Sequence, residues 1–539
     1  MQRRARAVGV TKGSVAGACS GHDLMRLLIR CDGGAQIGGG HVMRCLTLAE
    51  AMRKDGGEAA FVLAEDRGGL ADLVRQARFR VTEIPPAPRP PDPSAPPHGD
   101  WLSAPWQADA EVTARAALST TADWLVWDHY GLDSRWVAQI RSACPGLRVM
   151  AIDDLGDRPL GSDLLLDQTR LAAAPRSGPV WGRMTGPAFA LLRSGFADAR
   201  PAALARRGGP VARVLILPGL ADAAGLAPLA LRALDPFVGL AVDIAMGSAS
   251  QSRTETAALV ADRPVATLHL DPPDMAALMA RADLCIGAGG MSAWERCALG
   301  LPSVAVCVAD NQRDALAGLA AAGAAITLGL TEARQPGRLA AAIGSAIAGA
   351  PAMSRAAARL CDGRGTARVI TGLSGKLRPV TAADKALLFG WRNQPAIRAA
   401  SITQDPLDPD AHAAWLGRTL ARTDGLWCIY SEADRPLGHI NATHDSQDTW
   451  HWSFYIGATD APRGAGSRMM AAFLHHILQR PDFGRMTAEV RRDNLASIHL
   501  HQSFGFETAP APGPDLLAFT WSRCDQGSAF SYPPIGTAP

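Results

Sequence analysis

The stretch Gly38-Gly39-Gly40-His41-Val42-Met43-Arg44 lies between a short apolar run and a helical pattern. The run Leu27-Leu28-Ile29 predicts a buried strand that ends at Asp32-Gly33-Gly34. After the stretch, apolar residues recur at helical spacing as far as Met52, and Gly56-Gly57 ends the helix. A glycine loop that leads into a helix presents free backbone N–H groups, so we predict an anion site on a strand–loop–helix unit.

His41 is the residue in this stretch that can do chemistry. It falls in the first helical turn, where the positive end of the helix dipole disfavours the imidazolium form. A ring kept neutral in this way can accept a proton. The alternative interpretation is a tight turn with a partly exposed histidine.

The composition is that of an ordinary multidomain protein. The chain has 539 residues, of which 47% are hydrophobic and 19% charged, and its net charge is +3. This length predicts three or four domains, and the charge gives no reason to expect nucleic acid as a partner. The ten cysteines include no CxxC pair, which favours a reducing cytoplasm and no structural zinc.

The ends of the chain are predicted to lie outside the folded domains. Residues 1–24 carry Arg3, Arg4 and Arg6 but lack the apolar core of a secretory signal, and Met25 is a more natural start. We interpret them as a disordered extension or a wrongly chosen start codon, and residues 526–539 as a flexible tail. No run of about 18 apolar residues occurs, so no membrane-spanning segment is expected.

Strand and helix patterns alternate over residues 25–200, as in a parallel α/β domain. The proline-dense segment 85–97 is predicted to be an exposed loop. Polar residues directly follow two of the strands, as Asp128-His129-Tyr130 and as Asp153-Asp154. Carboxyl ends of parallel strands form the ligand crevice, which makes these residues site candidates; turn and capping chemistry is the alternative.

A second α/β series over residues 205–370 contains a second glycine loop. The loop Gly287-Ala288-Gly289-Gly290-Met291-Ser292-Ala293-Trp294-Glu295 leads into a helix predicted at 292–299. The strand that follows, 301–306, precedes Asp310-Asn311-Gln312. Two doubly wound halves, each with a glycine loop facing a crevice, predict a nucleotide-sugar clamp of the GT-B type.

Together the two loops make the chain resemble one family over about residues 25–370. They are followed by a proline-containing strand and Asn-Gln, as in the metal-independent UDP-sugar hydrolase of the pseudaminic acid pathway. Further matches are Asp128-His129-Tyr130-Gly131, Ile152-Asp153-Asp154-Leu155, Leu191-Leu192-Arg193, Glu295-Arg296-Cys297 and Gly300-Leu301-Pro302. One departure is Gly219-Leu220-Ala221-Asp222, where the family usually has Gly-Gly-Ser-Asp; Leu220 puts a phosphate contact from this turn in doubt.

The resemblance implies hydrolysis without a metal, with His41 as the general base. Glu295 would accept hydrogen bonds from the ribose hydroxyls, although Ser292-x-x-Glu295 is also a capping box. The remaining substrate-binding candidates each have a structural alternative, such as a surface arginine, a core tyrosine or the start of the next helix. They are Gly40, Arg44, Asp128, Tyr130, Gly289, Gly290, Ser292, Asn311 and Gln312.

Residues 374–525 resemble a different family, the GNAT acetyltransferases. Trp391-Arg392-Asn393, with His412 and Trp415, looks most like the enzyme that N-acetylates a UDP-4-amino-sugar in the same pathway. The resemblance implies acetyl-CoA as co-substrate and an α+β fold. The pyrophosphate of acetyl-CoA would accept hydrogen bonds from backbone N–H groups at the start of a helix. The predicted cofactor-binding residues are Arg463, Gly464, Ala465, Gly466, Ser467 and Asn494.

Two residues depart from the acetyltransferase pattern. Arg468 stands where the loop usually has Gly or Ala, and His501 stands where a tyrosine is common. His501, or solvent, is therefore the predicted proton donor to the leaving CoA thiolate. An exposed helical histidine is the alternative.

We therefore expect a GT-B-like pair of Rossmann-type domains followed by a GNAT domain. The expected activities are N-acetylation of a UDP-4-amino-sugar and inverting hydrolysis of a UDP-2,4-diacetamido-2,4,6-trideoxyhexose, a step toward a nonulosonic acid. A glycosyltransferase with an accessory acetyltransferase domain is the alternative enzyme. A non-catalytic protein that binds UDP-sugar is the third interpretation.

Overall fold

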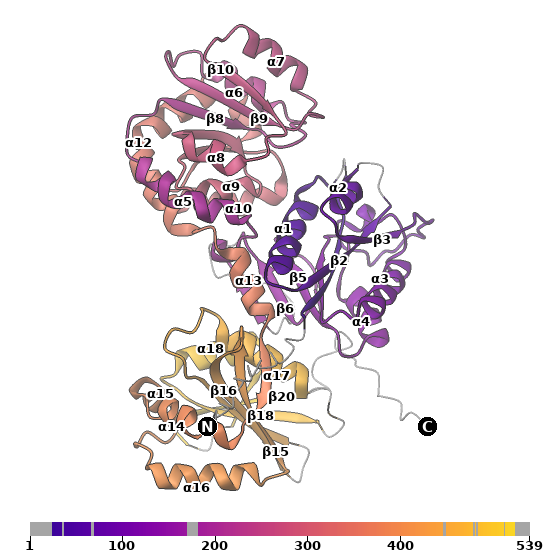
Figure 1. Cartoon of the computed structure of the whole chain (residues 1–539), viewed down its shortest axis with the longest axis vertical. Coiled ribbons are helices and arrows are strands. Elements are labelled where there is room, and N and C mark those ends of the chain that lie inside the picture. Colours follow the sequence, from indigo (N-terminus) through magenta and orange to yellow (C-terminus); the bar gives the residue numbers. More distant parts are fainter. Residues whose placement is uncertain are drawn as a thin grey trace, which may run out of the picture.

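The computed structural model describes residues 24–34, 37–65, 69–169, 182–445, 449–477, 480, 483–510 and 513–522. The predicted N-terminal extension, apart from Leu24, and the predicted tail lie outside these residues. Three domains follow one another along the molecule, with the second at the top of Figure 1, the first in the middle and the third at the bottom.

The first domain is built on a parallel sheet of order β3-β2-β1-β4-β5-β6-β7. Its strands read as apolar runs because both faces are buried, one of them under α3 and α4. The strands are β1 (Arg26–Cys31), β2 (Glu58–Ala64), β3 (Arg80–Ile84), β4 (Trp124–Asp128), β5 (Arg148–Ile152), β6 (Leu164–Asp167) and β7 (Gly182–Thr185). The helices are α1 (Gly40–Lys54), α2 (Leu70–Gln76), α3 (Trp106–Thr120), α4 (Ser134–Ala143) and the short η1 (Gly99–Trp101) and η2 (Pro187–Phe189). The next helix, α5 (Ser194–Arg206), packs on the second domain (Figure 1).

The second domain repeats this plan with the order β10-β9-β8-β11-β12-β13. Its strands are β8 (Arg213–Leu217), β9 (Ala241–Met246), β10 (Ala266–Leu270), β11 (Leu284–Ala288), β12 (Ser303–Cys307) and β13 (Ile326–Gly329). Its helices are α6 (Leu226–Ala233), α7 (Arg253–Ala261), α8 (Met275–Arg281), α9 (Ser292–Ala298), η3 (Asp310–Gln312), α10 (Arg313–Ala321), α11 (Leu330–Ala333) and α12 (Arg338–Leu360). In both sheets the strand order reverses beside the first strand, where Rossmann-type folds bind their ligands.

Helix α13 (Gly365–Leu373) links all three domains. It leaves the second domain and packs against α1 of the first (Figure 1). Trp124 donates its indole N–H to the carbonyl of Leu373, and Arg148 donates to the carbonyl of Gly375. One buried apolar cluster runs from Met184 through Leu373 to Met469, so the core is continuous from the first domain into the third.

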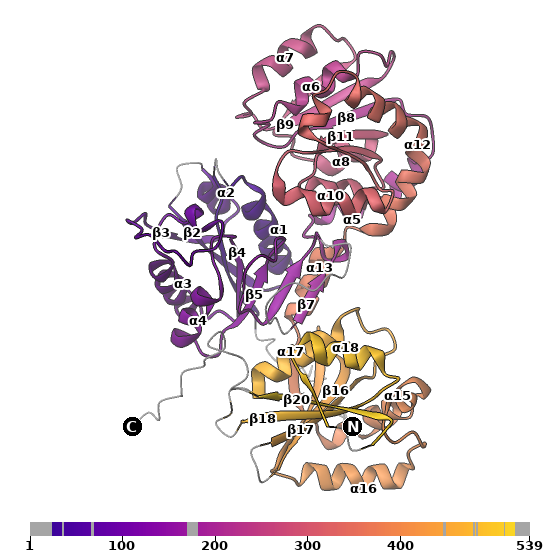
Figure 2. The same cartoon turned by 180° about the vertical axis from the view of Figure 1, so that it is seen from behind.

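The third domain is a mixed seven-stranded sheet of order β14-β15-β16-β17-β18-β20-β19. Helices α14–α16 cover one face and α17 packs on the other (Figure 2). The strands are β14 (Lys376–Pro379), β15 (Gly425–Glu432), β16 (Arg435–His444), β17 (Thr449–Ile456), β18 (Arg485–Arg491), β19 (Glu507–Ala509) and β20 (Leu516–Ser522). The helices are η4 (Ala382–Asp384), α14 (Lys385–Arg392), α15 (Pro395–Ala400), α16 (Pro409–Leu420), α17 (Ala465–Ile477) and α18 (Leu495–Ser503).

The predicted fold class is confirmed: two Rossmann-type domains are followed by an α+β domain with the acetyltransferase layout. Strand β7 and the return of α13 to α1 were not predicted. Among the described residues, no helix is both long and apolar enough to cross a bilayer.

Candidate active sites

The first glycine loop positions α1 beneath the carboxyl ends of the strands. Gly34 and Gly38 form an isolated bridge, and Gly38 has a φ of +80°, a conformation that disfavours residues with a side chain. This turn brings the chain from the end of β1 into α1, whose N-cap, Gly39, has no side chain to offer. The first-turn N–H groups of α1 therefore lie at the edge of the sheet where the predicted site residues gather.

His41 is held by a carboxylate from a neighbouring strand. Its Nδ1 lies 2.5 Å from Oδ1 of Asp128, the last residue of β4. Burial acts to raise the pKa of Asp128, but the positive charge of Arg44 and the contact with His41 outweigh it and hold the pKa below its usual range. An ionised carboxylate only accepts hydrogen bonds, so Nδ1 carries the ring proton. Nε2 has no hydrogen-bond partner among the described residues and can accept a proton.

Arg44 lies one turn after His41 and shares its partner. Its Nε and Nη2 donate to the two carboxylate oxygens of Asp128 at 2.5 and 2.7 Å. Its Nη1 also donates to Asp154, which follows β5. The side chains of Asp128 and Arg44 are both almost fully buried. A bidentate pair of this kind fixes the orientation of the carboxylate that orients His41.

An aromatic cluster covers His41. The Tyr130 ring lies 4.6 Å from the His41 ring, at 78° to it, and its hydroxyl donates to Asp154 at 3.0 Å. The ring of Trp101 lies 5.8 Å from Tyr130 and 6.4 Å from His41, and His98 lies 4.6 Å from Trp101. Trp101 and His98 follow the proline-dense loop and were missed by the sequence analysis, which gave this segment no role beyond an exposed loop.

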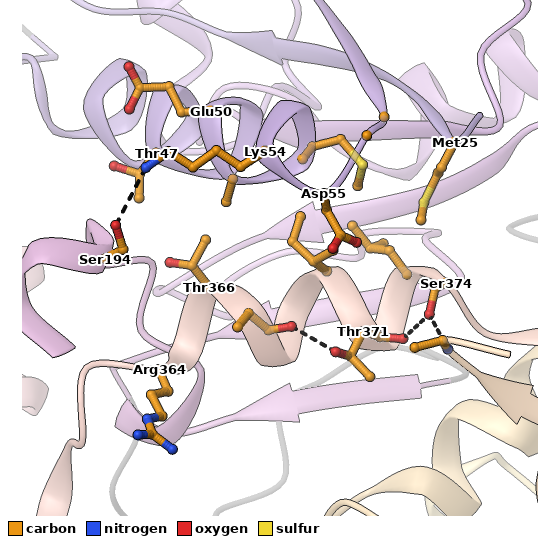
Figure 3. A pocket seen from close by; sticks show the side chains of 18 of the residues that line it. Met25, Thr47, Glu50, Lys54, Asp55, Ser194, Arg364, Thr366, Thr371 and Ser374 are labelled. Atoms are coloured by element: carbon orange, nitrogen blue, oxygen red, sulfur yellow. Dashed lines mark hydrogen bonds between the residues drawn. The ribbon is translucent and has the colours of Figure 1, made fainter. Parts of the chain in front are cut away.

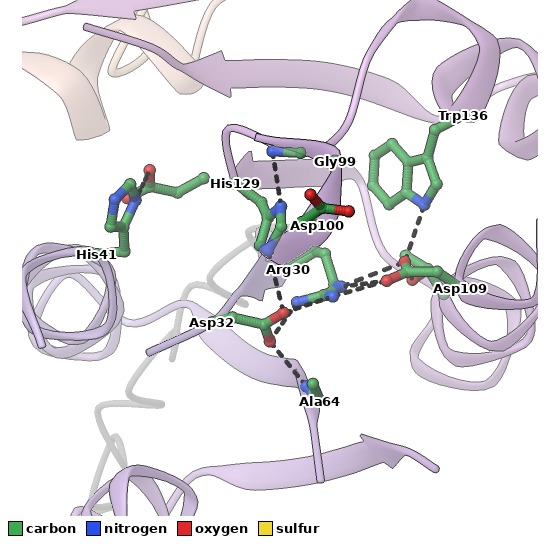
Figure 4. A network of polar contacts seen from close by, with 12 residues as sticks. Arg30, Asp32, His41, Ala64, Gly99, Asp100, Asp109, His129 and Trp136 are labelled. Carbon is green, nitrogen blue, oxygen red and sulfur yellow. Dashed lines mark hydrogen bonds and ion pairs between the residues drawn. The ribbon is translucent and has the colours of Figure 1, made fainter. Parts of the chain in front are cut away.

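A buried polar network lies beside the site (Figure 4). Arg30 pairs with Asp32 and with Asp109, each at 2.6 Å, and Trp136 donates to Asp109. His129 accepts the backbone N–H of Gly131 at Nδ1, so its Nε2 carries the proton that faces Asp32, 3.3 Å away. The network ties the ends of β1 and β4 together and thus fixes the segment that carries Asp128.

The two Rossmann-type domains enclose a cleft of about 610 Å³. Residues from both glycine loops and from the segments after them line it: Gly38, Gly39, Gly40 and Arg44 from the first domain, and Gly290, Ser292, Glu295 and Gln312 from the second. The predicted candidates Asp128, Tyr130, Gly289 and Asn311 are not among its lining residues, and Asn311 is exposed. His41 is also not in the lining; it lies between Gly40 and Arg44, which are.

The carboxylate of Glu295 is not used to cap its own helix and is available to a ligand. Helix α9 begins at Ser292 with Met291 as its N-cap and has no side-chain capping bond, so the capping box that was the alternative interpretation does not form. Its carboxylate is 3.9 Å from Arg193 across the cleft, and burial raises its pKa although Arg193 acts to lower it. A half-buried carboxylate in a cleft can accept hydrogen bonds from hydroxyl groups.

Gln312 and Asp222 support the walls of the cleft from within the second domain. The Gln312 side-chain oxygen accepts from the backbone N–H groups of Gly289 and Val308, at 3.3 and 3.1 Å. Asp222 accepts from the first N–H groups of α6, at 2.7 and 3.0 Å. Leu220, where the sequence departs from the family, is 60% exposed and points toward Gly39 across the cleft.

A second groove, of about 950 Å³, runs between α1 and α13 (Figure 3). It shares Thr47 and Arg193 with the cleft and extends to Ala433 and Asp434 of the third domain. Across it, the Lys54 amine lies 3.5 Å from the Ser194 hydroxyl. The groove therefore opens from the cleft toward the junction with the third domain.

In the third domain, β17 and β18 pair only at their starts. The parallel register runs from Thr449↔Arg485 to His451↔Thr487 and then ends, although both strands continue. A cavity of about 520 Å³ opens there, lined by Trp452, Phe454, Ala488, Val490 and Asn494, among others. Asn494 also caps α18 by accepting from the Ser497 N–H.

The predicted anion loop precedes α17. Gly464 has a φ of +82°, and the N–H of Arg468 donates to its carbonyl. The Arg468 side chain pairs with Glu432 at 2.6 Å and also donates to the Arg463 carbonyl of the loop at 3.0 Å. Tyr430 donates to the same carboxylate. Arg463, Gly464, Ala465, Gly466 and Ser467 do not line the cavity.

His501 lies in the cavity wall and is only 2% exposed. Its Nδ1 donates to the Ser497 carbonyl at 2.8 Å, and Nε2 has no partner among the described residues. Burial lowers the pKa of His501 to about 4, so at neutral pH the ring presents an acceptor to the cavity. The ring's hydrogen bonding gives no support to the predicted proton-donor role, which stays a prediction.

Comparison with known proteins gives the class of the third domain. Residues 376–507 match the family model of the acetyltransferase (GNAT) domain. The MurG structure from Acinetobacter baumannii is 16% identical and covers 64% of this chain and 98% of its own, with a TM-score of 0.46. An N-acetyltransferase from Staphylococcus aureus Mu50 is 21% identical and covers 28% of this chain and 98% of its own, with a TM-score of 0.25. The search of curated proteins found no match.

The chain thus carries a C-terminal GNAT acetyltransferase domain, which uses acetyl-CoA. An aminoglycoside acetyltransferase in complex with coenzyme A, 18% identical, covers 28% of this chain and 96% of its own, with a TM-score of 0.25. The structure of this chain fits the group, because β17 and β18 separate over a cavity and leave backbone groups without a strand partner between them. No group of His, Cys, Asp or Glu side chains among the described residues could hold a metal ion.

Proposed function

We propose that the chain acetylates a UDP-linked amino sugar in its third domain and hydrolyses a UDP-2,4-diacetamido-2,4,6-trideoxyhexose in the cleft of the first two. The observation that carries the hydrolase part is the unit of His41, Asp128 and Arg44 beside a cleft lined by both glycine loops. The location is proposed to be cytoplasmic.

In the proposed hydrolysis, Nε2 of His41 takes a proton from water as the water oxygen bonds to the anomeric carbon. The bond from that carbon to the phosphate oxygen breaks, and UDP leaves with the electron pair. Asp128 stabilises the imidazolium that forms, and backbone N–H groups of the glycine loops meet the charge on UDP. Direct displacement inverts the anomeric centre. Glu295 accepts from the ribose hydroxyls.

In the proposed acetyl transfer, the gap between β17 and β18 holds the cofactor, which supplies an activated acetyl group. Asn494 and the Arg463–Ser467 loop lie on the cofactor side. His412 and Trp415 lie on the acceptor side, where α16 forms part of the cavity wall. Acetylation precedes hydrolysis if the hydrolase takes only the diacetylated sugar.

The alternative is a glycosyltransferase that passes the sugar to an acceptor. The pair of Rossmann-type domains around an open cleft favours it as much as hydrolysis, because the same architecture serves both reactions. In that reaction His41 would deprotonate an acceptor hydroxyl in place of water.

The test is to incubate the full chain with acetyl-CoA and a UDP-2-acetamido-4-amino-2,4,6-trideoxyhexose, following free thiol and UDP together. We expect thiol first and UDP after it. Thiol without UDP would favour the glycosyltransferase and would be followed by a search for a sugar acceptor. Neither product with any such sugar would contradict the proposal.

A further inference from the structure

The cavity of the third domain reaches two sides of the sheet. One end lies in the gap between β17 and β18. The other lies under the helices α14–α16, where Arg392 of α14 and His412 and Trp415 of α16 line it. Among the described residues, several side chains that line the cavity carry a buried polar atom without a partner. These atoms are Nη1 of Arg392, Nδ1 of His412, both ring nitrogens of His439, Nε1 of Trp452 and Nε2 of His501.

Neither nitrogen of His439 has a hydrogen-bond partner among the residues that the structure describes. It lies in the middle of β16, opposite Tyr455 of β17, and its ring is 5.4 Å from the tyrosine ring. Asn441 and Ser453 form the next pair on the same face and bond each other at 2.9 Å. His439 is only 3% exposed, so water in bulk does not satisfy it.

The ring of His439 is uncharged at neutral pH. Burial lowers its pKa to about 4, although the negative charge of Asp384 on η4 acts to raise it. The other groups that face this end of the cavity are Tyr455, Arg392 and His412. Burial also lowers the pKa of His412 and raises that of Tyr455, so Arg392 is the charged group among these three.

A neutral imidazole offers one N–H donor and one lone pair, on opposite sides of the ring. An ammonium group could donate to the lone pair but could not accept from the N–H. The negative charge of a phosphate would be repelled by the lone pair. A hydroxyl or an acetamido group both donates and accepts. A buried donor and acceptor left unpaired destabilise the unliganded protein, so a ligand that pairs them gains in affinity.

We propose that His439 binds an uncharged hydroxyl or acetamido substituent of the acetyl acceptor, and so selects the sugar that is acetylated. This inference rests on the proposed acetylation of an amino sugar and adds the group by which the sugar is recognised. His439 is a binding residue in this account. Its weak basicity makes it unsuited to take the proton of the acceptor amine.

The test compares the full chain with His439→Phe and His439→Gln, using acetyl-CoA and UDP-2-acetamido-4-amino-2,4,6-trideoxyhexose. Phenylalanine keeps the ring against Tyr455 and removes both nitrogens, whereas glutamine keeps a donor and an acceptor. We expect His439→Phe to raise the KM for the sugar by about 10- to 100-fold, the size of one or two lost hydrogen bonds, and His439→Gln to recover much of it. The KM for acetyl-CoA stays unchanged in both variants.

The effects of the substitutions on folding and on ionisation are measured separately. His439→Phe should melt at the same or a higher temperature without ligand, because it removes two unpaired polar atoms. His499→Leu, an exposed histidine on α18, is the control and should match the unaltered chain. A pH–rate profile between pH 6 and 9 should keep its shape in His439→Gln.

The inference is overturned if folded His439→Phe leaves the KM for the sugar unchanged. If His439→Phe does not fold, His439→Leu replaces it, and an unchanged KM in that variant overturns the inference. A shifted low-pH limb in His439→Gln would overturn it too, since that would make the ring a base. If the unaltered chain transfers acetyl to no UDP-amino sugar, the proposed acetylation fails and this inference with it. Transfer by the unaltered chain with no effect of His439→Phe overturns the inference alone.

Discussion

The two histidine sites of this chain are built in opposite ways. Around His41, the ring nitrogen Nδ1, both oxygens of Asp128 and the guanidinium of Arg44 are all engaged before any ligand arrives. His439, in contrast, lines a cavity, and neither of its ring nitrogens has a partner in the part of the chain that the structure describes. The first site is thus rigid and its chemistry is set by the protein, whereas the second depends on its ligand to complete the hydrogen bonds.

The difference predicts opposite effects on stability. Removing one member of the His41 unit leaves a buried charge without its partner, which destabilises the fold. Removing the polar atoms of His439 takes away unpaired groups, which does not. The His41 site can be tested by substitutions whose expected effects range from large to small.

His41→Asn should lower kcat for UDP-sugar hydrolysis by about 10²- to 10⁴-fold, because it removes the base that activates water. UDP affinity should stay unchanged, since His41 does not line the cleft. Stopped assays of UDP release and calorimetric UDP binding measure the two effects. His269→Asn is the matched control, because His269 on β10 also contacts a carboxylate, at 2.7 Å, but lies outside the cleft lining. Equal losses in both variants would contradict the role of His41.

Asp128→Asn should lower the free energy of unfolding by about 3–5 kcal/mol, the usual cost of breaking a buried pair. The folded-state pKa of Asp128 is depressed, so its contribution is present above its ordinary pKa of about 3.9 and is lost as the pH falls through the folded value. Melting curves should therefore converge for the two proteins as the pH falls below about 4. Asp72→Asn removes an exposed pair with Arg75 and should cost less than about 1 kcal/mol. A gap between the melting curves of Asp128→Asn and the unaltered chain that stays constant with pH would show that Asp128 does not act through its charge.

Glu295→Gln should weaken UDP binding by about 10- to 100-fold if the carboxylate accepts from the ribose hydroxyls. Calorimetry with UDP and with 2′,3′-dideoxy-UDP separates this contact from others, because the variant should bind both ligands alike. The control is Glu255→Gln, which alters an exposed pair between Glu255 on α7 and Arg232 on α6. If the unaltered chain also binds the two ligands alike, Glu295 does not contact the ribose.

Trp101→Ala should lower kcat/KM for hydrolysis by about 2- to 10-fold, the size of one aromatic contact. Its ring covers His41 together with Tyr130, so its loss leaves the His41 ring less well positioned. The control is Trp106→Ala. Trp106 is the first residue of α3, and its ring packs against the guanidinium of Arg135. A larger loss in the control would place the aromatic requirement outside this cluster.

The sequence predicted the frame of the first two domains because their buried strands are continuous apolar runs and their glycine loops mark the strand ends. It could not predict that α13 returns to α1, since that contact depends on the packing of distant segments. It placed His41 and Arg44 on α1. That Asp128 holds both of them follows from the register of β1 with β4, in which Cys31 lies opposite Asp128.

The predicted site is partly brought together. Gly40, Arg44, Gly290, Ser292, Glu295 and Gln312 share one cleft, as loops at the carboxyl ends of parallel strands should. The capping box at Ser292 and Glu295 fails because the helix begins at Ser292, one residue earlier than the motif requires. The sequence could not identify His439 as a site residue. The pattern of a buried strand is the same whether or not an inward-facing side chain has a hydrogen-bond partner.

The central claim is that His41 activates water. The most direct measurement follows the full chain and UDP-2,4-diacetamido-2,4,6-trideoxyhexose by NMR without any sugar acceptor. The account predicts UDP and free sugar whose first-formed anomer is inverted, and no such release by His41→Asn. A UDP-sugar that stays intact until an acceptor hydroxyl is added would contradict it.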